Sequence, residues 1–200
     1  MAFTDFTPEN VQQKLGITLR VIGLFPKLAP VSVPAWLTDQ LAKTSQPALL
    51  NEKSRSEFIV APILIAVRDL TDGKVVILSG ARLDMDPLRG LNGECDFILS
   101  SGLPLPILQP PLLTLVEAKK QDIESAIGQC LAQMVAANMF NEKAGINNQP
   151  IYGCVTTGEA WQFLRLRGTS AELDPHRLYL DNLGGILAAL LRAVGHSGTP

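Results

Sequence analysis

Two short apolar runs on either side of a proline-rich interval form the most distinctive hydrophobic pattern in the chain. They are Gly93–Leu99 and Leu112–Lys120, both rich in Ile, Leu and Val, and each carries charge at one end. Both runs are too short for an ordinary helix, which predicts two neighbouring β-strands joined by a hairpin-like connection. Four prolines between them exclude a central strand, so residues 100–111 are predicted to form an exposed loop, unusually apolar for one.

After Lys120 the hydrophobic period changes from two to 3.6, which predicts a helix from Ile123 to about Phe140 with Asp122 as its N-cap. A second helix, from Leu183 to Val194, shows the same amphipathic spacing. A third, from Asn51 to Asp69, becomes apolar nearly all round in its second half, and this indicates burial against a sheet. Pro62 is expected to kink or break that helix.

The remaining periodic segments predict further strands. Asp72-Gly73 is interpreted as a hairpin turn before a strand at residues 74–79, because Asp-Gly next to a β-branched run is strong turn chemistry. The later strands are predicted at residues 151–157 and 161–167, with an edge strand at 177–180.

The N-terminal quarter shows short helical patterns between proline breaks. Helices are predicted at residues 8–15, with Thr7 as N-cap, and at 34–43. We therefore expect residues 1–50 to wrap the core without contributing chemistry. The 200 residues suit a single domain, divided into this wrapping segment, a core at 51–167, and an edge strand and helix at 168–200.

The charges at the ends of the first two strands suggest a metal site. Side chains alternate along a strand, so Glu117 and Lys119 share one face, and Asp96 lies alongside if the two strands pair. Carboxylate oxygens suit a hard cation such as Mg²⁺ or Mn²⁺, which could stabilise charge on a phosphate under attack. The lysine could orient or activate the attacking water.

The arrangement resembles the PD-(D/E)XK nuclease superfamily, with Asp96, Glu117 and Lys119 as the matching residues and Ala118 as the X. It departs from the pattern where Cys95 stands in place of the proline, a position that forms no ligand. The resemblance covers roughly residues 51–167 and implies an α/β fold, a restriction-endonuclease-like mixed sheet flanked by helices. It also implies that the Ala118 carbonyl joins the metal ligands and that the substrate is DNA.

In many superfamily members the first core helix adds a glutamate to the site, and two residues compete for that role here. Counting 100° per residue aligns Glu52 with the buried Ile59, whereas Glu57 shares a stripe with Arg68 and can be read as its solvated partner. Both glutamates remain open.

A glutamine on the helix after the second catalytic strand lines the site in several branches of the superfamily. Gln129 is the first candidate and Gln133 the second, since an amide can bind phosphate, a base edge or water; the alternative is two solvated glutamines. The candidates for holding backbone phosphates are Lys120, Arg82 and Arg89. Alternation places Arg82 on one side of its strand with Asp84 and Asp86. We interpret these three side chains as a polar rim at the edge of the sheet, in preference to an additional carboxylate near the metal.

Composition limits these functions only loosely. A net charge of −2 and a pI near 5.7 give no overall basic footprint for nucleic acid, although a nuclease needs only a local basic rim. Without an 18-residue apolar run or a signal-like start, the chain is expected to be soluble and cytoplasmic, away from membranes. The three cysteines lack CxxC spacing, so buried thiols are expected and zinc is not.

The sequence thus predicts a Mg²⁺- or Mn²⁺-dependent nuclease acting on DNA. One active site cuts one strand, which makes a homodimer plausible for double-strand cleavage. The alternative is a catalytically silent nuclease-fold protein that serves as a regulatory or assembly subunit, because fold does not fix function. A Cys–His hydrolase is disfavoured, since neither histidine lies near a cysteine in a recognisable pattern.

Overall fold

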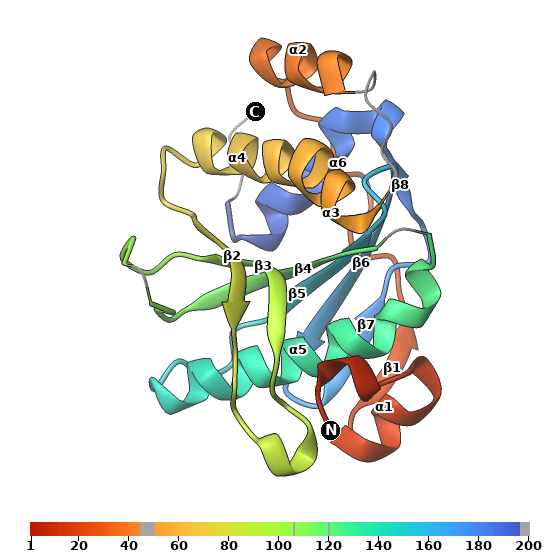
Figure 1. The fold of residues 1–200 in the computed structure, drawn as a ribbon, viewed down its shortest axis with the longest axis vertical. Helices are drawn as coiled ribbons and strands as arrows, with labels where there is room; N and C mark the ends of the chain where they lie inside the picture. Colours follow the sequence, from red (N-terminus) through yellow and green to blue (C-terminus); the bar gives the residue numbers. More distant parts are fainter. Residues whose placement is uncertain (45–50, 106, 120, 197–200) are drawn as a thin grey trace.

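The computed structural model describes residues 1–44, 51–105, 107–119 and 121–196, which form a mixed sheet with helices on both faces (Figure 1). The strand order is β1-β7-β6-β5-β4-β3-β2, and β8 pairs with β6 off this path. The pairs β1–β7 and β4–β5 are parallel and the others are antiparallel. The strands are β1 (Thr18–Val21), β2 (Val76–Arg82), β3 (Glu94–Ser100), β4 (Leu112–Ala118), β5 (Ile151–Thr156), β6 (Ala160–Arg167), β7 (Ser170–Leu173) and β8 (Leu178–Tyr179).

Helices cover the sheet in two layers (Figure 1). One face packs against α1 (Pro8–Leu15) and α5 (Ile123–Lys143), and the other against α2 (Ala35–Thr44), α4 (Ala61–Leu70) and α6 (Leu183–Ala193). The short α3 (Glu52–Arg55) precedes α4. Among the described residues, none of these helices is both long enough and apolar enough to cross a membrane.

Strand alternation sorts the core into two apolar layers. On β3 and β4, Ile98 and Leu115 point toward α5, whereas Phe97 and Val116 point toward α4 and α6. Burial on both faces explains why these strands are apolar throughout. The predicted α/β fold with a mixed sheet between helices is confirmed.

Several predicted elements are confirmed with shifted bounds. Strands β3 and β4 pair antiparallel, and α5 makes the crossover from β4 to the parallel β5. The Asp122 side chain caps α5 by accepting from the Ser125 amide (3.1 Å), and the helix continues three residues past Phe140. The described part of the loop after β3 contains no helix or strand, and Leu103 and Ile107 in it are exposed.

Residues 1–50 also contribute a strand that the sequence did not predict, because β1 lies in this segment and pairs with β7. Sequence analysis missed both strands. Each has four residues, and β1 is exposed at three of its four positions, so neither shows a buried alternating pattern.

The Asp72-Gly73 turn does not form a hairpin. It links α4 to β2, with φ values of 54° and 72° at the two residues. The turn chemistry was recognised correctly, but the element before the turn is a helix. Strand β2 begins at Val76 and extends to Arg82, since its pairing with β3 continues to Glu94.

The helix predicted from Asn51 is continuous but irregular. After α3 the residues Ser56–Val60 form a π-helical turn, and α4 begins at Ala61 with Pro62 in its first turn. Proline lacks the amide that would bond to the preceding turn, and it is tolerated at such a start. The irregularity changes which side chains face the sheet.

Candidate active site

The candidate site lies where β3 and β4 separate. Their backbone pairing runs from Ser100–Leu112 to Phe97–Val116 and stops there. Beyond that point β3 pairs only with β2, and the Asp96 carboxylate takes the place of a backbone partner by accepting from the Ala118 amide (2.8 Å). Gly80, opposite Asp96 on β2, has φ +62°, a conformation that glycine allows at low cost.

Glu117 is the next residue of β4 and is 2% exposed. Its Oε1 accepts from the Lys119 ammonium (2.8 Å) and from the Gln129 amide, and its Oε2 accepts from the Gln133 amide (2.8 Å). The two glutamines lie one turn apart on α5, so one face of this helix holds the carboxylate in place. The expectation that Gln129 lines the site agrees with this position.

Gln133 does not fit its predicted contact with nucleic acid. Its side chain is fully buried, its Nε2 binds Glu117, and its Oε1 has no hydrogen-bond partner within the described parts of the chain. A side chain with no exposed surface cannot touch a substrate. Gln133 therefore positions Glu117, and the alternative of a solvated glutamine is also wrong.

Burial and mutual repulsion shift the titration of the carboxylates. Burial, with the charge of Asp96 as a second cause, raises the pKa of Glu117 to about 7, although Lys119 opposes the shift. Burial also raises the pKa of Asp96, against its hydrogen bond from Ala118 and the charge of Lys119. Burial lowers the pKa of Lys119, but Glu117 and Glu52 outweigh this and raise it overall. A cation between the carboxylates would relieve their repulsion.

The structure separates the two glutamates that the sequence left open. Glu52 Oε1 lies 3.8 Å from the Lys119 ammonium, whereas Glu57 pairs with Lys53 (3.8 Å) and not with Arg68 as predicted. Glu52 is 47% exposed and does not continue the buried stripe. The reason is the π-helical turn, which shifts the first helical turn by about one residue, or roughly 100°, relative to a regular count.

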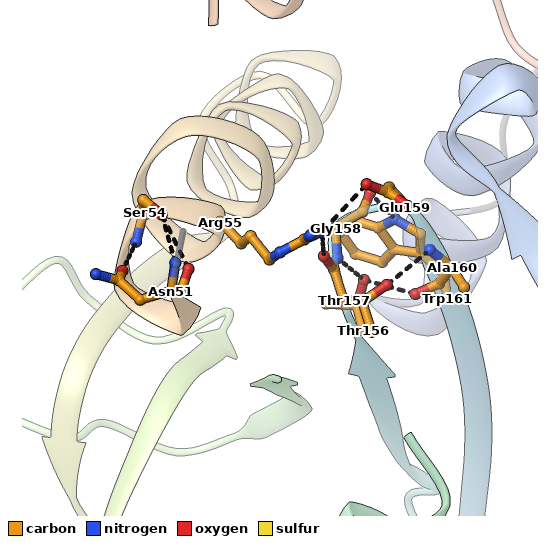
Figure 2. A network of polar contacts seen from close by, with 9 residues as sticks. All are labelled: Asn51, Ser54, Arg55, Thr156, Thr157, Gly158, Glu159, Ala160 and Trp161. Atoms are coloured by element: carbon orange, nitrogen blue, oxygen red, sulfur yellow. Dashed lines mark hydrogen bonds and ion pairs between the residues drawn. The ribbon is translucent and has the colours of Figure 1, made fainter. Parts of the chain in front are cut away.

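A polar network fixes α3 beside the site (Figure 2). Asn51 caps the helix by accepting from the Ser54 amide (2.8 Å), and Arg55 donates to the Thr157 carbonyl (3.0 Å) and to Glu159 (3.2 Å) in the β5–β6 turn. The turn adjoins the end of β4, because the Lys119 amide donates to the Thr156 carbonyl (2.7 Å). Arg55 thereby ties the helix that carries Glu52 to the backbone that carries Lys119.

The site opens into a groove of about 1070 Å³ between α3–α4 and the β2–β3 pair. Asp96 and Ala118 line it, whereas Glu117 and Lys119 do not belong to its lining. Its charged lining residues are Glu52, Lys53, Glu57, Arg68, Glu94 and Asp96. Sequence analysis did not consider Glu94, although strand alternation places it on the Asp96 side, two residues earlier.

The proposed phosphate-binding arginines lie outside the groove lining. Arg82 pairs with Asp84 (2.7 Å), which also accepts from the Gly93 amide, and the Asp86 side chain accepts from the Arg89 amide. These local contacts agree with the polar rim that sequence analysis preferred. Lys120 lies outside the described residues.

The donor set fits a hard divalent cation with few protein ligands. Across the described ranges no group of three or more His, Cys, Asp or Glu side chains is arranged to hold a metal ion. Mg²⁺, however, is commonly held by one or two carboxylates and several waters. Asp96 Oδ1 has no hydrogen-bond partner among the residues that the structure describes, so this oxygen is available as a ligand. The three cysteines are buried and unpaired, as expected.

Comparisons with known proteins do not assign the chain to a family. No protein-family model matches the sequence, and no curated protein matches it.

Proposed function

We propose that this protein is a metal-dependent nuclease that hydrolyses phosphodiester bonds, with DNA as the expected substrate and Mg²⁺ or Mn²⁺ as the cofactor. The proposal includes a restriction-endonuclease-like core. Its support is the order of elements from α3–α4 through the antiparallel β2–β3–β4 to α5, the parallel β5 and the antiparallel β6.

The observation on which the proposal rests is the separation of β3 and β4 beside the groove. There one carboxylate, Asp96, replaces a backbone partner, and a second, Glu117, is buried against the ammonium of Lys119, the residue that follows β4. A purely structural ion pair would need Glu117 and Lys119 alone. It would not need Asp96, whose negative charge works against the ionisation of Glu117.

Each residue then has a role defined by its contacts. Asp96, Glu117 and the Ala118 carbonyl would hold the cation, which when bound supplies positive charge to the phosphate. Lys119, 22% exposed and in contact with Glu117, orients the attacking water or stabilises the developing charge. Glu52 holds Lys119 from the opposite side, and Gln129 and Gln133 fix the Glu117 carboxylate.

The direct test is cleavage of DNA by the purified protein in the presence of Mg²⁺ or Mn²⁺. We expect Asp96→Ala and Lys119→Ala each to lower the rate by about 100-fold or more, since each removes a charge from the reacting centre. Lys143→Ala, which removes an exposed ammonium at the far end of α5, is the matched control. Equal activity in all three variants, each shown to be folded by circular dichroism, would assign the cleavage to a contaminant or to another site.

One observation favours the catalytically silent alternative. Both oxygens of Glu117 already accept hydrogen bonds, so the network around it is satisfied without a cation. A metal titration followed by thermal unfolding separates the alternatives, because a ligand that binds only the folded state must raise the melting temperature. A rise with millimolar Mn²⁺ that disappears in Asp96→Ala supports the nuclease. The absence of any shift in the wild type supports the regulatory or assembly role.

A further inference from the structure

The groove extends well beyond the carboxylates. One wall is the continuous helical segment from Glu52 to Arg68, and the other is the edge strand β2, of which residues 76–80 all line the groove. Sixteen residues separate Glu52 from Arg68, and at 1.5 Å per residue this wall is about 24 Å long. The acidic end with Asp96 and Glu94 is therefore far from Arg68.

The size of the groove bears on the kind of polymer it can hold. The groove has a volume of about 1070 Å³ and lies along this wall of about 24 Å. A B-form duplex keeps its bases stacked inside, whereas an unpaired strand can lay its bases along the lining of such a groove.

The lining changes in character along the groove. Arg68 is exposed, and its guanidinium has no ion pair or hydrogen bond in the part of the chain that the structure describes. Lys53, by contrast, is paired with Glu57 (3.8 Å). Besides its charged residues the groove presents apolar side chains, of which Ile65 is 45% and Leu105 43% exposed. Unpaired bases offer apolar faces to such a surface, whereas the bases of a duplex are stacked inside it.

We propose that the groove binds a single strand of nucleic acid, with Arg68 holding a backbone phosphate at one end and the carboxylates receiving the scissile phosphate at the other. The inference rests on the proposed function for the acidic end only. Its substrate class is single-stranded nucleic acid, including flaps and frayed ends. A strand with the B-form rise of 3.4 Å per nucleotide needs about seven nucleotides to span the groove, and a more extended strand needs fewer.

Binding measured in EDTA tests the inference independently of cleavage. Labelled single strands of three and twelve nucleotides and a twelve-base-pair hairpin duplex are titrated with the protein at several salt concentrations. We expect the twelve-nucleotide strand to bind at least about tenfold more tightly than the duplex. Arg68→Ala should weaken its binding about tenfold and reduce the slope of log K against log salt by about 0.7, the value for one lost phosphate contact on a single strand.

Arg167→Ala provides the matched control, because Arg167 is an exposed arginine at the end of β6 that does not line the groove. It should change neither affinity nor slope, and the three-nucleotide strand, which is too short to span the groove, should bind more weakly than the twelve-nucleotide strand. Equal or tighter binding of the duplex, no effect of Arg68→Ala on the twelve-nucleotide strand, or no binding of any oligonucleotide would overturn the inference.

The outcomes also distinguish this inference from the proposed nuclease activity. If the single strand binds through Arg68 but is not cut with Mn²⁺, the groove assignment stands and the hydrolytic function fails. If DNA is cut through Lys119 while duplex and single strand bind equally and Arg68→Ala has no effect, the nuclease stands and the groove assignment fails.

Discussion

Glu117 shows how one buried side chain can depend on every element around it. It belongs to β4, receives its amide donors from α5, and contacts an ammonium that α3 also contacts through Glu52. A buried carboxylate without such donors would lose several kcal/mol of hydration without compensation. The three donors make burial possible but do not restore an ordinary pKa.

The pKa of Glu117 predicts how stability depends on pH. The folded protein releases this proton near pH 7, whereas an unperturbed glutamate releases it near 4.5. Between these values the folded state binds more protons than the unfolded state, so the free energy of unfolding falls as pH rises. The contribution of Glu117 to the free energy of unfolding is fully present below pH 4.5 and is lost as the pH rises past 7.

Urea unfolding between pH 5 and pH 8, without divalent cations, measures this dependence. Glu117→Gln removes the titrating group and should flatten the decline, whereas Glu142→Gln, at an exposed position of the same helix, should leave it unchanged. A wild-type profile that matches that of Glu117→Gln would contradict the pKa shift.

Sequence reasoning located the central side chains better than it located their supporting partners. Asp96, Glu117 and Lys119 were expected to gather because strand alternation and pairing fix their side, and the structure brings them together. The pairing of Glu57 with Lys53 was not predicted, although the two residues stand four apart, the spacing at which helical side chains meet; Arg68, eleven residues on, lies three turns away. Gln133 was misread because a buried carboxylate on another element, not local polarity, decides that it is buried.

At the scale of elements, close contacts fix how the N-terminal segment packs on α5. A Cβ added at Gly128 would lie 2.4 Å from the carbonyl carbon of Thr7 and 2.6 Å from the carbonyl oxygen of Phe6. Both atoms belong to the backbone and cannot move without shifting the segment. Glycine in the middle of α5 therefore allows a backbone to lie directly against the helix.

Gly128→Ala tests this packing. In a free helix alanine would be favoured by about 1 kcal/mol, but the clash should reverse the sign and destabilise the protein by about 1–3 kcal/mol. Thermal or urea unfolding measures the change. Gly23→Ala is the control, because a Cβ there meets no atom within 4 Å. Stabilisation by Gly128→Ala would show that the N-terminal segment does not sit against α5 as described.

The elements that the sequence predicted correctly have long or strongly periodic patterns, such as α5 and the strands β4 to β6. The short strands β1 and β7 were missed because pairing with each other and with β6, rather than an apolar pattern of their own, holds them in the sheet. Local propensity contains no information about such distant partners. The π-helical turn was also missed, since neither Pro62 nor the hydrophobic period indicates an extra residue in the preceding turn.

For the whole molecule, the N-terminal segment belongs to the same folded unit as the rest. Phe3, Phe6 and Val11 are buried in the apolar layer on the α5 face, and β1 adds a strand to the common sheet. The sequence predicts a single domain made of this wrapping segment, a core, and a C-terminal edge strand and helix. A shared layer and a shared sheet predict one cooperative unfolding transition for all three parts.

Phe6→Ala tests that cooperativity with a probe on the opposite face. Trp161 is fully buried in the layer beneath α4 and α6, and replacing the exposed Trp36 with Phe makes its fluorescence the only tryptophan signal. Removing a buried phenyl group lowers the free energy of unfolding by about 3–5 kcal/mol. The unfolding transition seen by Trp161 fluorescence should therefore move to a lower urea concentration, together with the transition seen by the helical signal. Val21→Ala, at a position 66% exposed, should move neither. A Trp161 transition unchanged by Phe6→Ala would mean that the two layers unfold separately.

The π-helical turn between α3 and α4 separates the orientation of the α3 side chains from that of the α4 side chains. Residues Ile63 and Leu64 of α4 are locked into the apolar interior, which leaves that helix no rotational freedom. The π-helical turn at Ser56–Val60 rotates the preceding turn about the helix axis relative to α4. Glu52 can therefore face Lys119, and Arg55 can face the β5–β6 turn, without any change in the packing of α4. A single residue inserted or deleted in this stretch would thus redirect Glu52 and Arg55 while the rest of the protein kept its fold.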